Sequence, residues 1–506
     1  MRTIQPSGPR HLRDRAGLRG PDAPGATVPV DTGVPALIVK IGRYPLHHGG
    51  VGAIRTLGRL GIPVYAITED SFTPAAVSRY CRGSFVWPTT GREDPDQLVD
   101  GLMAIGDKLG RRTVAVPTDE EAAVLLAEHA SRLSEHFLLP DVQPGLPRKL
   151  ASKQGLHELC REHGVPAPAS AFPSTSEALA DFASQASFPV VAKNLEAWVR
   201  RQRPAVAGTT IFGTEQELLA AAEDWGAEPS VILQEYIPRE QAQDWIVHLY
   251  CDADSDCLVE FTGIKVRSWP PHAGMTACAR TVPNPALARA AARFCKRIGF
   301  SGIADLDWRL DLRDGQYKLL DFNPRVGAQF RLFETAAGLD VVRAMHLDLT
   351  ARPVPASPQV NGRKLIVENI DPLARLAYRG RACGPALADH MPGPGRKLRT
   401  ELAWLAPDDP LPFVAMSARL AGPAIGHISR TWRSRKLRRR AAREAAGPDS
   451  GSPEPSTAGE QISRGAGTSA RHAIAASAVG ISEIARVPRT AARPPTLAGQ
   501  RREGAS

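Results

Sequence analysis

The sequence lacks the marks of a secreted or membrane-spanning protein. No uninterrupted apolar run of about 18 residues occurs in it, so a membrane-spanning helix is not expected. No apolar segment follows the arginines near its start, and we therefore expect no secretory signal. The seven cysteines are odd in number and include no C-x-x-C pair. This pattern favours free thiols in the reducing cytoplasm over a disulfide framework or a zinc site.

The remaining composition is that of an ordinary globular protein. Hydrophobic residues make up 43% and charged residues 23% of the 506 positions, a length that suits two or three domains. The formal net charge of +10 comes partly from a dense basic stretch at residues 432–440. Such stretches are usually solvated tails, so the charge does not indicate a nucleic-acid partner, and none is expected.

Composition and hydrophobic patterning divide the chain into five parts. The two ends are rich in Arg, Pro, Gly, Ala and Ser and lack periodicity, so we expect residues 1–33 and 445–506 to be disordered. Residues 34–149 have an α/β pattern, whereas residues 150–351 combine antiparallel strands and helices as an α+β pair of lobes. Residues 352–444 have Pro-rich joints and form an accessory region with a basic end.

The first folded part begins with a βαβ unit. Buried-strand patterns at residues 36–39 and 64–67 flank an amphipathic helix, which predicts a Rossmann-like parallel sheet. A cluster of glycines at residues 49–52 opens that helix. It suits either a backbone that approaches an anionic ligand or a purely structural tight turn. His47 and His48 precede the cluster and are candidates for substrate contact or for ordinary loop positions.

The most informative stretch lies between residues 303 and 325. Alternating apolar and polar residues predict two short strands, and Asp314-Gly315 is a strong turn signal between them. Such a hairpin would carry Asp307 and Asp321 side by side. Two carboxylates and the amide oxygen of Asn323 suit Mg²⁺ bound together with substrate phosphates. Arg325 would then hold a transferring phosphoryl group through a bidentate contact.

An acidic residue followed fourteen positions later by acidic-x-Asn-Pro-Arg resembles the metal-binding end of the ATP-grasp superfamily. That superfamily includes D-alanine ligases, biotin carboxylases, the large subunit of carbamoyl-phosphate synthetase and D-aspartate ligases. The resemblance covers residues 36–350. It implies a Rossmann-like N-terminal domain followed by a two-lobed ATP-grasp domain, with ATP and Mg²⁺ as cofactors. The family usually has Glu at the position of Asp321, although the shorter side chain still binds Mg²⁺ in some branches.

The resemblance also implies how the phosphates of ATP are held. Lys153, at the start of a helix, and Lys193, at the end of a strand, stand where the family has lysines that meet the α and β phosphates. A second cation is expected beside Arg325 on the γ-phosphate. Lys265, Arg267 and Arg280 follow the central strands, and we select Arg280 because residues 274–276 before it suit a loop that opens onto the site.

The adenosine contacts follow from the same resemblance. Residues 234–237 resemble the hinge between the lobes, where the backbone of Glu235 and Ile237 reads the adenine edge. Asp244 is the candidate for the ribose hydroxyls, with Glu240 as the alternative because the family usually places its Glu slightly earlier. Residues 194–208 stand in the place of the phosphate-covering loop and carry several Arg residues instead of the usual Gly and Ser.

These parts together imply an ATP-dependent, ADP-forming carboxylate–amine ligase that acts on small-molecule or peptide-like substrates. Carboxylation and phosphorylation are alternative ATP-grasp reactions, and a non-catalytic nucleotide-binding or membrane-associated protein is a third reading. No biotin-attachment motif occurs, which argues against a self-contained carboxylase. Apolar segments next to the basic stretch suit either an anionic membrane surface or a packed helix with a tail, so peripheral membrane contact through residues 411–443 is one expectation for a cytoplasmic protein.

Overall fold

The structure is a computed structural model, and it describes seven segments of the chain. They are residues 28–195, 205–206, 208–226, 228–271, 274–379, 399–421 and 496–497. The disorder expected for residues 1–33 and 445–506 falls almost entirely on residues outside the described ones. The basic stretch at 432–440 also lies outside them. The chain divides into two compact units, Met1–Ser417 with Pro495–Ser506 and Ala418–Pro494. The described elements belong to the first unit, and most of the second unit lies outside the described residues.

The N-terminal part is built on a six-stranded sheet with the order β17-β3-β2-β1-β4-β5. Strands β1 to β5 are parallel to one another, and only β17 (Thr496–Leu497) runs antiparallel, beside β3. The other elements of this part are β1 (Ala36–Val39), α1 (His48–Gly58), β2 (Val64–Thr68), β3 (Cys81–Val86), α2 (Pro95–Leu109), β4 (Thr113–Pro117), α3 (Glu120–Glu128), α4 (Ala130–Leu133) and β5 (Phe137–Leu138).

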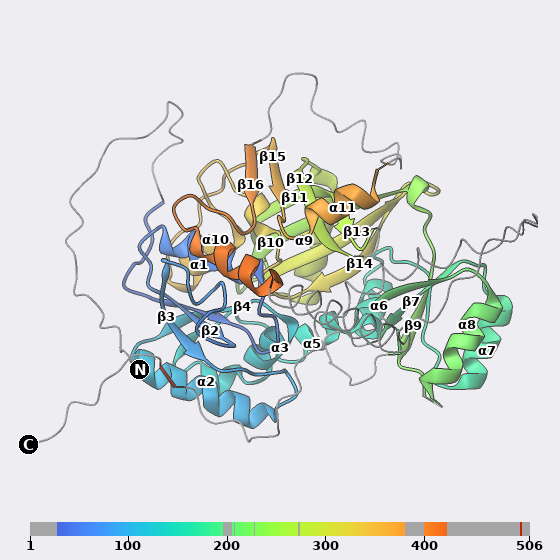
Figure 1. Ribbon diagram of the computed structural model, residues 1–506, viewed down its shortest axis with the longest axis horizontal. Helices are drawn as coiled ribbons and strands as arrows, with labels where there is room; N and C mark the ends of the chain where they lie inside the picture. Colours follow the sequence, from blue (N-terminus) through green and yellow to red (C-terminus); the bar gives the residue numbers. More distant parts are fainter. Residues whose placement is uncertain are drawn as a thin grey trace, which may run out of the picture. The chain divides into compact units, whose positions relative to one another are not determined.

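A smaller lobe follows, with a four-stranded antiparallel sheet in the order β6-β9-β7-β8. Helices α7 and α8 pack against each other on this sheet (Figure 1). The elements here are α5 (Leu146–Ala151), α6 (Lys153–Glu162), β6 (Ser170–Ala171), α7 (Ser176–Gln185), β7 (Val190–Asn194), β8 (Thr209–Phe212), α8 (Glu215–Ala222), η1 (Glu223–Trp225) and β9 (Val231–Glu235).

A larger lobe contains a seven-stranded sheet with the order β14-β13-β10-β11-β12-β15-β16. Its last two strands come from the expected accessory region, so that region extends this sheet. The elements are η2 (Arg239–Gln241), β10 (Ala242–Cys251), β11 (Cys257–Trp269), β12 (Met275–Thr281), α9 (Pro285–Ile298), β13 (Gly302–Asp311), β14 (Gln316–Asn323), η3 (Phe330–Leu332), α10 (Val341–Leu349), β15 (Arg363–Ile366), α11 (Asp371–Ala377) and β16 (Arg399–Leu402), before a helical run at 411–421.

Local sequence signals explain where several helices begin and end. Helix α9 starts after Asn284, whose side chain accepts the Leu287 N–H, and Pro285 occupies its first turn without losing a needed donor. Gly299 ends it with a φ of 66°, a left-handed conformation that glycine adopts without strain.

Among the described residues, no helix is long and apolar enough to cross a membrane.

Candidate functional site

The predicted hairpin is formed by β13 and β14, which pair in antiparallel register. Asp307 lies opposite Asp321, and Asn323 lies opposite Asp305. The turn ends at Gly315, which has a φ of 70°. The Asn323 side chain donates to the Asp305 carbonyl at 3.0 Å, and this bond fixes the side-chain amide of the residue directly before Pro324. The hairpin therefore presents two carboxylates and an amide at one end of the sheet.

Each of the two carboxylates meets a lysine. The Lys265 ammonium lies 2.7 Å from Asp307 Oδ2, and Lys153 forms an ion pair with Asp321. Although burial disfavours the charged form of Lys265, the pair with Asp307 raises its pKa. The other oxygen of Asp307, Oδ1, is buried and has no hydrogen-bond partner among the described residues. A buried anionic oxygen without a donor is uncommon and fits a cation that completes it.

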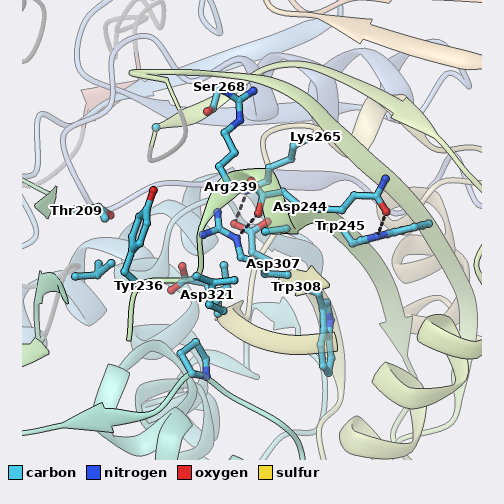
Figure 2. A pocket seen from close by; sticks show the side chains of 18 of the residues that line it. Thr209, Tyr236, Arg239, Asp244, Trp245, Lys265, Ser268, Asp307, Trp308 and Asp321 are labelled. Atoms are coloured by element: carbon cyan, nitrogen blue, oxygen red, sulfur yellow. Dashed lines mark hydrogen bonds and ion pairs between the residues drawn. The ribbon is translucent and has the colours of Figure 1, made fainter. Parts of the chain in front are cut away.

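The hairpin borders a cavity of about 280 Å³ that lies between the small lobe and the large sheet. Figure 2 shows Asp244, Lys265 and Asp307 gathered in the middle of its lining. Six of the ten site residues selected from the sequence line this cavity: Lys193, Glu235, Ile237, Asp244, Asp307 and Asp321. The remaining four, Lys153, Asn323, Arg325 and Arg280, are not part of the lining.

Two half-buried lysines of this region, Lys153 and Lys193, lose their charge more easily than an exposed lysine does. Burial lowers the pKa of Lys193 to about 7 and that of Lys153 to about 8. Desolvation has this effect because it disfavours the charged ammonium. An anionic group bound nearby would restore the charge, so both side chains are suited to bind phosphate oxygens.

The hinge at residues 235–237 has only part of the expected geometry. The Glu235 N–H donates to the Ala169 carbonyl at 2.9 Å, so a contact of this residue with adenine has to come from its carbonyl. The Glu235 carboxylate lies 2.9 Å from the Lys318 ammonium and 2.8 Å from the Arg313 guanidinium. These ion pairs connect the hinge to the β13–β14 hairpin through Arg313 in its turn and Lys318 on β14.

Asp244 lines the cavity, whereas its alternative, Glu240, does not. Arg309 lies opposite Asp244 in the register of β10 and β13, and its Nε donates to Asp244 Oδ1 at 2.7 Å. Burial by itself would raise the pKa of Asp244, but the Arg309 charge lowers it. Sequence reasoning missed Arg309 because this pair appears only once the register of the two strands is known.

Arg325 is held by two carboxylates from different parts of the chain. Its guanidinium lies 2.8 Å from Glu120 at the start of α3 and 3.0 Å from Asp305 on β13. Asp305 in turn lies 2.9 Å from His248 Nε2. None of Glu120, Asp305 and His248 was predicted as a site residue from the sequence. No local pattern in the sequence indicates the contact between Arg325 and Glu120, which are 205 residues apart.

Arg280 lies on β12 opposite Ile264 and is 5% exposed. Of Lys265, Arg267 and Arg280, it is Lys265 that forms an ion pair with Asp307. Arg267 also lines the cavity and pairs with Asp371. The role expected for Arg280 at the γ-phosphate therefore stays a prediction.

The glycine cluster lies inside α1 and not in an open loop. A Cβ at Gly52 would come within 2.9 Å of the Phe330 and Arg331 side chains, so the glycines let α1 approach the segment that follows Arg325. His47 caps the helix, with its Nδ1 accepting the Gly50 N–H at 3.0 Å. Burial lowers the pKa of His47 well below its usual value and that of His48 to about 4, so both rings are neutral at pH 7.

The ends of the expected phosphate-covering loop meet in one contact. The Asn194 side chain donates to the Val206 carbonyl at 2.7 Å and accepts the Val206 N–H at 3.2 Å. Residues 196–204, with the arginines on which the prediction depends, lie outside the described residues. Whether arginines cover the phosphates thus stays a prediction.

Comparisons with known proteins agree with this geometry. Residues 252–349 match the family model of the carbamoyl-phosphate synthase L chain, ATP binding domain. A D-aspartate ligase of Enterococcus faecium is 26% identical over 231 residues, which cover 44% of this chain and 55% of that protein. The chain thus matches about half the length of this curated relative.

Solved structures show the same fold. The N5-carboxyaminoimidazole synthetase from Staphylococcus aureus superposes with a TM-score of 0.51 at 12% identity, over 70% of this chain and 88% of that one. The same enzyme complexed with ADP gives a TM-score of 0.50 at 11% identity, over 66% and 81% of the two chains. These structures confirm the fold class expected from the sequence, and the matches to the ATP binding domain and the D-aspartate ligase confirm the expected resemblance to the ATP-grasp superfamily.

Proposed function

We propose that this chain is an ATP- and Mg²⁺-dependent ligase that activates a carboxylate as an acyl phosphate and joins it to an amine. ADP and inorganic phosphate would be the other products. One observation carries the proposal: Asp307 and Asp321 face each other across a hairpin, and Arg325 follows directly after it. Such an arrangement suits phosphoryl transfer, in which positioning and charge stabilisation supply most of the catalysis.

The hairpin residues Asp307, Asp321 and Asn323 would hold Mg²⁺. The buried Oδ1 of Asp307 supports this role because it has no donor among the described residues. Within the same described part, no three His, Cys, Asp or Glu side chains are placed to hold a metal by themselves. A short ligand set of this kind is typical of Mg²⁺, which shares its coordination with substrate phosphates and water. The bound ion would neutralise charge on the β and γ oxygens.

The remaining site residues would hold the nucleotide. Lys153 and Lys193 would bind phosphate oxygens, and the ion pair of Lys153 with Asp321 supports a role for Lys153 next to the proposed metal ligands. The Glu235 carbonyl and the Ile237 backbone would read adenine. Asp244 would accept from the ribose hydroxyls while Arg309 holds one of its oxygens.

The chemistry then needs no protein nucleophile. A substrate carboxylate oxygen attacks the γ-phosphorus, and the bond from that phosphorus to the ADP oxygen breaks. Arg325 stabilises the negative charge on the transferring group, and its two carboxylate partners keep it in place. The amine then attacks the acyl carbon, phosphate leaves with the bonding electrons, and the ammonium proton is lost to solvent.

The N-terminal sheet supports a site for the second substrate. From β1 the chain continues to β2 and β3 on one side of the sheet and then crosses to β4 on the other side of β1. Ligands of open α/β sheets bind at the carboxyl ends of the two strands that flank such a switch point, here β1 and β4. A small cavity there is lined by Lys40, His47 and Thr118, among others, and Lys40 lies 2.8 Å from Glu69. Because the curated relative is a D-aspartate ligase, we propose amino acids with acidic side chains as the first substrates to test.

The test measures phosphate release by the purified full chain with Mg²⁺-ATP against panels of carboxylates and amines, with D-aspartate in both. Release that requires one member of each panel, together with an amide product in the mass spectrum, would support the ligase. Release that requires bicarbonate alone would instead support carboxylation. Asp321→Asn should abolish either activity. An unchanged rate in that variant would contradict the proposed site.

The expected membrane contact through residues 411–443 also stays a prediction. Only the helical run at 411–421 is described, and it exposes 54% of Leu411 and 57% of Val414. The basic residues that would face anionic lipid lie outside the described part. Co-sedimentation of the full chain with vesicles that contain anionic lipid would test this contact separately from catalysis.

A further inference from the structure

The C-terminal region reaches the same cavity as the proposed nucleotide contacts. Helix α11 packs against β11, and Tyr378, the residue after α11, lines the cavity together with Asp244 and Lys265. Tyr378 lies after residues 150–351, which the sequence predicts as the ATP-grasp domain, and outside residues 252–349 that match the family model. A residue from beyond the core fold therefore contributes to the lining.

A buried ion pair fixes α11 to the cavity. Asp371, at the start of α11, is 2% exposed and accepts from Arg267 Nε at 2.8 Å. Arg375, one turn later on the same helix, donates to the other oxygen of Asp371 at 2.7 Å. Because Arg267 itself lines the cavity, this carboxylate holds the helix directly behind the cavity wall. The position of Tyr378 is thereby set by the large sheet.

Tyr378 meets a cation that comes from the hinge side. The Arg239 guanidinium carbon lies 4.7 Å from the centre of the Tyr378 ring, a distance typical of a cation–π contact. The Tyr378 hydroxyl is 3.4 Å from both the backbone nitrogen and the hydroxyl of Ser268. Figure 2 shows the Arg239 side chain extending towards Ser268. Arg239 belongs to η2, which directly follows the hinge at residues 235–237.

This contact lies at the ribose end of the proposed site. The charge of Arg309, with smaller contributions from Lys265 and Arg239, lowers the pKa of the Asp244 carboxyl, the proposed ribose contact, against the effect of burial. The metal hairpin is farther along the strands, because Asp307 pairs with Ile246, two residues beyond Asp244 on β10. A wall at this place would contact the nucleoside and leave the phosphates to the lysines.

We propose that Tyr378 and Arg239 together form the ribose-side wall of the nucleotide site and position the nucleoside for binding. The inference rests on the proposed function, since it assumes that the cavity takes a nucleotide. It makes the C-terminal region a part of the binding site. Tyr378 is a positioning residue that acts through Arg239 and through the shape of the wall.

The test compares Mg²⁺-ADP binding by isothermal titration calorimetry in full-chain variants. Tyr378→Ala should weaken binding by roughly fivefold to thirtyfold, the range that corresponds to a partly desolvated cation–π contact. Tyr378→Phe keeps the ring and should stay close to the unmodified chain. Leu376→Ala is the matched control, because Leu376 lies two residues before Tyr378 in α11, is 62% exposed and is not part of the lining.

A double-mutant cycle separates the wall from a general loss of structure. Arg239→Ala should weaken ADP binding about as much as Tyr378→Ala, and the two changes together should cost little more than either alone. Additive losses, or equal affinity in Tyr378→Ala and the unmodified chain, would overturn the inference. In steady-state assays the change should appear in KM for ATP, with kcat nearly constant.

The outcomes distinguish this inference from the proposed function. If the unmodified chain binds ADP but Tyr378→Ala binds it equally well, the wall is wrong and the nucleotide site stands. If the unmodified chain binds no nucleotide, both are wrong. If ADP binds as expected but no amide forms with any substrate pair, the ligase proposal is wrong and the wall is still decided by the variants.

Discussion

The two facing carboxylates of the hairpin are each neutralised by a lysine, Asp307 by Lys265 and Asp321 by Lys153. In the complex with a nucleotide, the two ammonium groups would pair with phosphate oxygens, and the carboxylate oxygens would then be available to bind Mg²⁺. We expect Asp307→Asn to lower kcat by more than about 100-fold, because it removes a charged metal ligand and not merely its support.

The measurement for Asp307→Asn is phosphate release under saturating substrates. ADP binding in the absence of Mg²⁺ should stay at the level of the unmodified chain. Asp314→Asn is the matched control, since Asp314 lies in the turn of the same hairpin and is not part of the cavity lining. Equal losses in the two variants would indicate damage to the hairpin and would contradict the role of Asp307.

Lys193 predicts a particular pH dependence of nucleotide binding. Burial lowers its pKa to about 7 in the free protein, and a bound phosphate favours the charged ammonium and raises this pKa again. Above pH 7 the free protein carries a neutral amine, so binding takes up a proton and affinity falls as the pH rises. The ADP dissociation constant should increase with a slope that approaches about tenfold per pH unit above pH 8.

Calorimetry of ADP binding in two buffers of different ionisation enthalpy measures this proton uptake. The control is Lys193→Arg, whose guanidinium stays charged and should flatten the profile. Lys153, whose pKa is about 8, would leave a dependence that begins about one pH unit higher in that variant. A flat profile in the unmodified chain would show that Lys193 is already charged without nucleotide.

Strand β13 carries a second acidic residue, Asp305, which holds Arg325. Asp305 and Asp307 are two positions apart and share one face of the strand. Asp305 is 3% exposed, accepts from Arg325 at 3.0 Å and lies 2.9 Å from His248 Nε2. Gly327 passes so close that a Cβ there would lie 2.6 Å from the Asp305 carboxylate. This packing leaves Arg325 one well-defined orientation.

We expect Asp305→Asn to lower kcat by about 10- to 100-fold, the usual effect of removing a partner that orients a functional group. The KM for ATP should change much less, because Asp305 is not part of the cavity lining. Steady-state kinetics with ATP as the varied substrate would measure both. A loss confined to KM would mean that Arg325 acts in binding and not in the transition state.

The sequence predicts elements better than it predicts contacts between them. Asp314-Gly315 and the alternating pattern around it were sufficient to predict the hairpin and its facing carboxylates. The pair of Asp244 and Arg309 depends on the register of β10 and β13, which no local signal specifies. Arg325 likewise meets Glu120, which lies at the start of α3 beside the N-terminal sheet. Short segments of sequence predict the hairpin and the residues it carries, whereas the ion-pair partners of those residues depend on strand register and on how separate sheets pack.

At the scale of the whole molecule, the C-terminal residues hold the N-terminal sheet to the large one. The guanidinium of Arg55, in the last turn of α1, donates to the Trp404 carbonyl at 2.7 Å and to Asp409 Oδ2 at 2.9 Å. Nearer the site, the Val326 N–H donates to the Pro117 carbonyl at 3.1 Å. Two separate connections therefore position the proposed second-substrate site against Arg325. Sequence patterns placed these residues in different domains and gave no sign of the contacts.

The buried pair of Arg55 and Asp409 should make the larger contribution to stability. Their side chains are 4% and 1% exposed, and Asp409 also accepts from the Ser78 hydroxyl at 2.7 Å. Asp409→Ala leaves the Arg55 charge buried without its carboxylate, so the free energy of unfolding should fall by about 3–5 kcal/mol.

The neighbouring pair of Arg59 and Asp408 is the matched control. Its side chains are 28% and 41% exposed, so water screens the interaction and Asp408→Ala should cost about 1 kcal/mol or less. Urea unfolding followed by tryptophan fluorescence would measure both variants, since Trp404 is buried beside the contact. Similar losses for the two would mean that Arg55 finds water or another acceptor when Asp409 is removed. A loss confined to Asp409→Ala, with reduced ligase activity at temperatures where the variant is still folded, would show that this C-terminal contact sets the position of the N-terminal sheet.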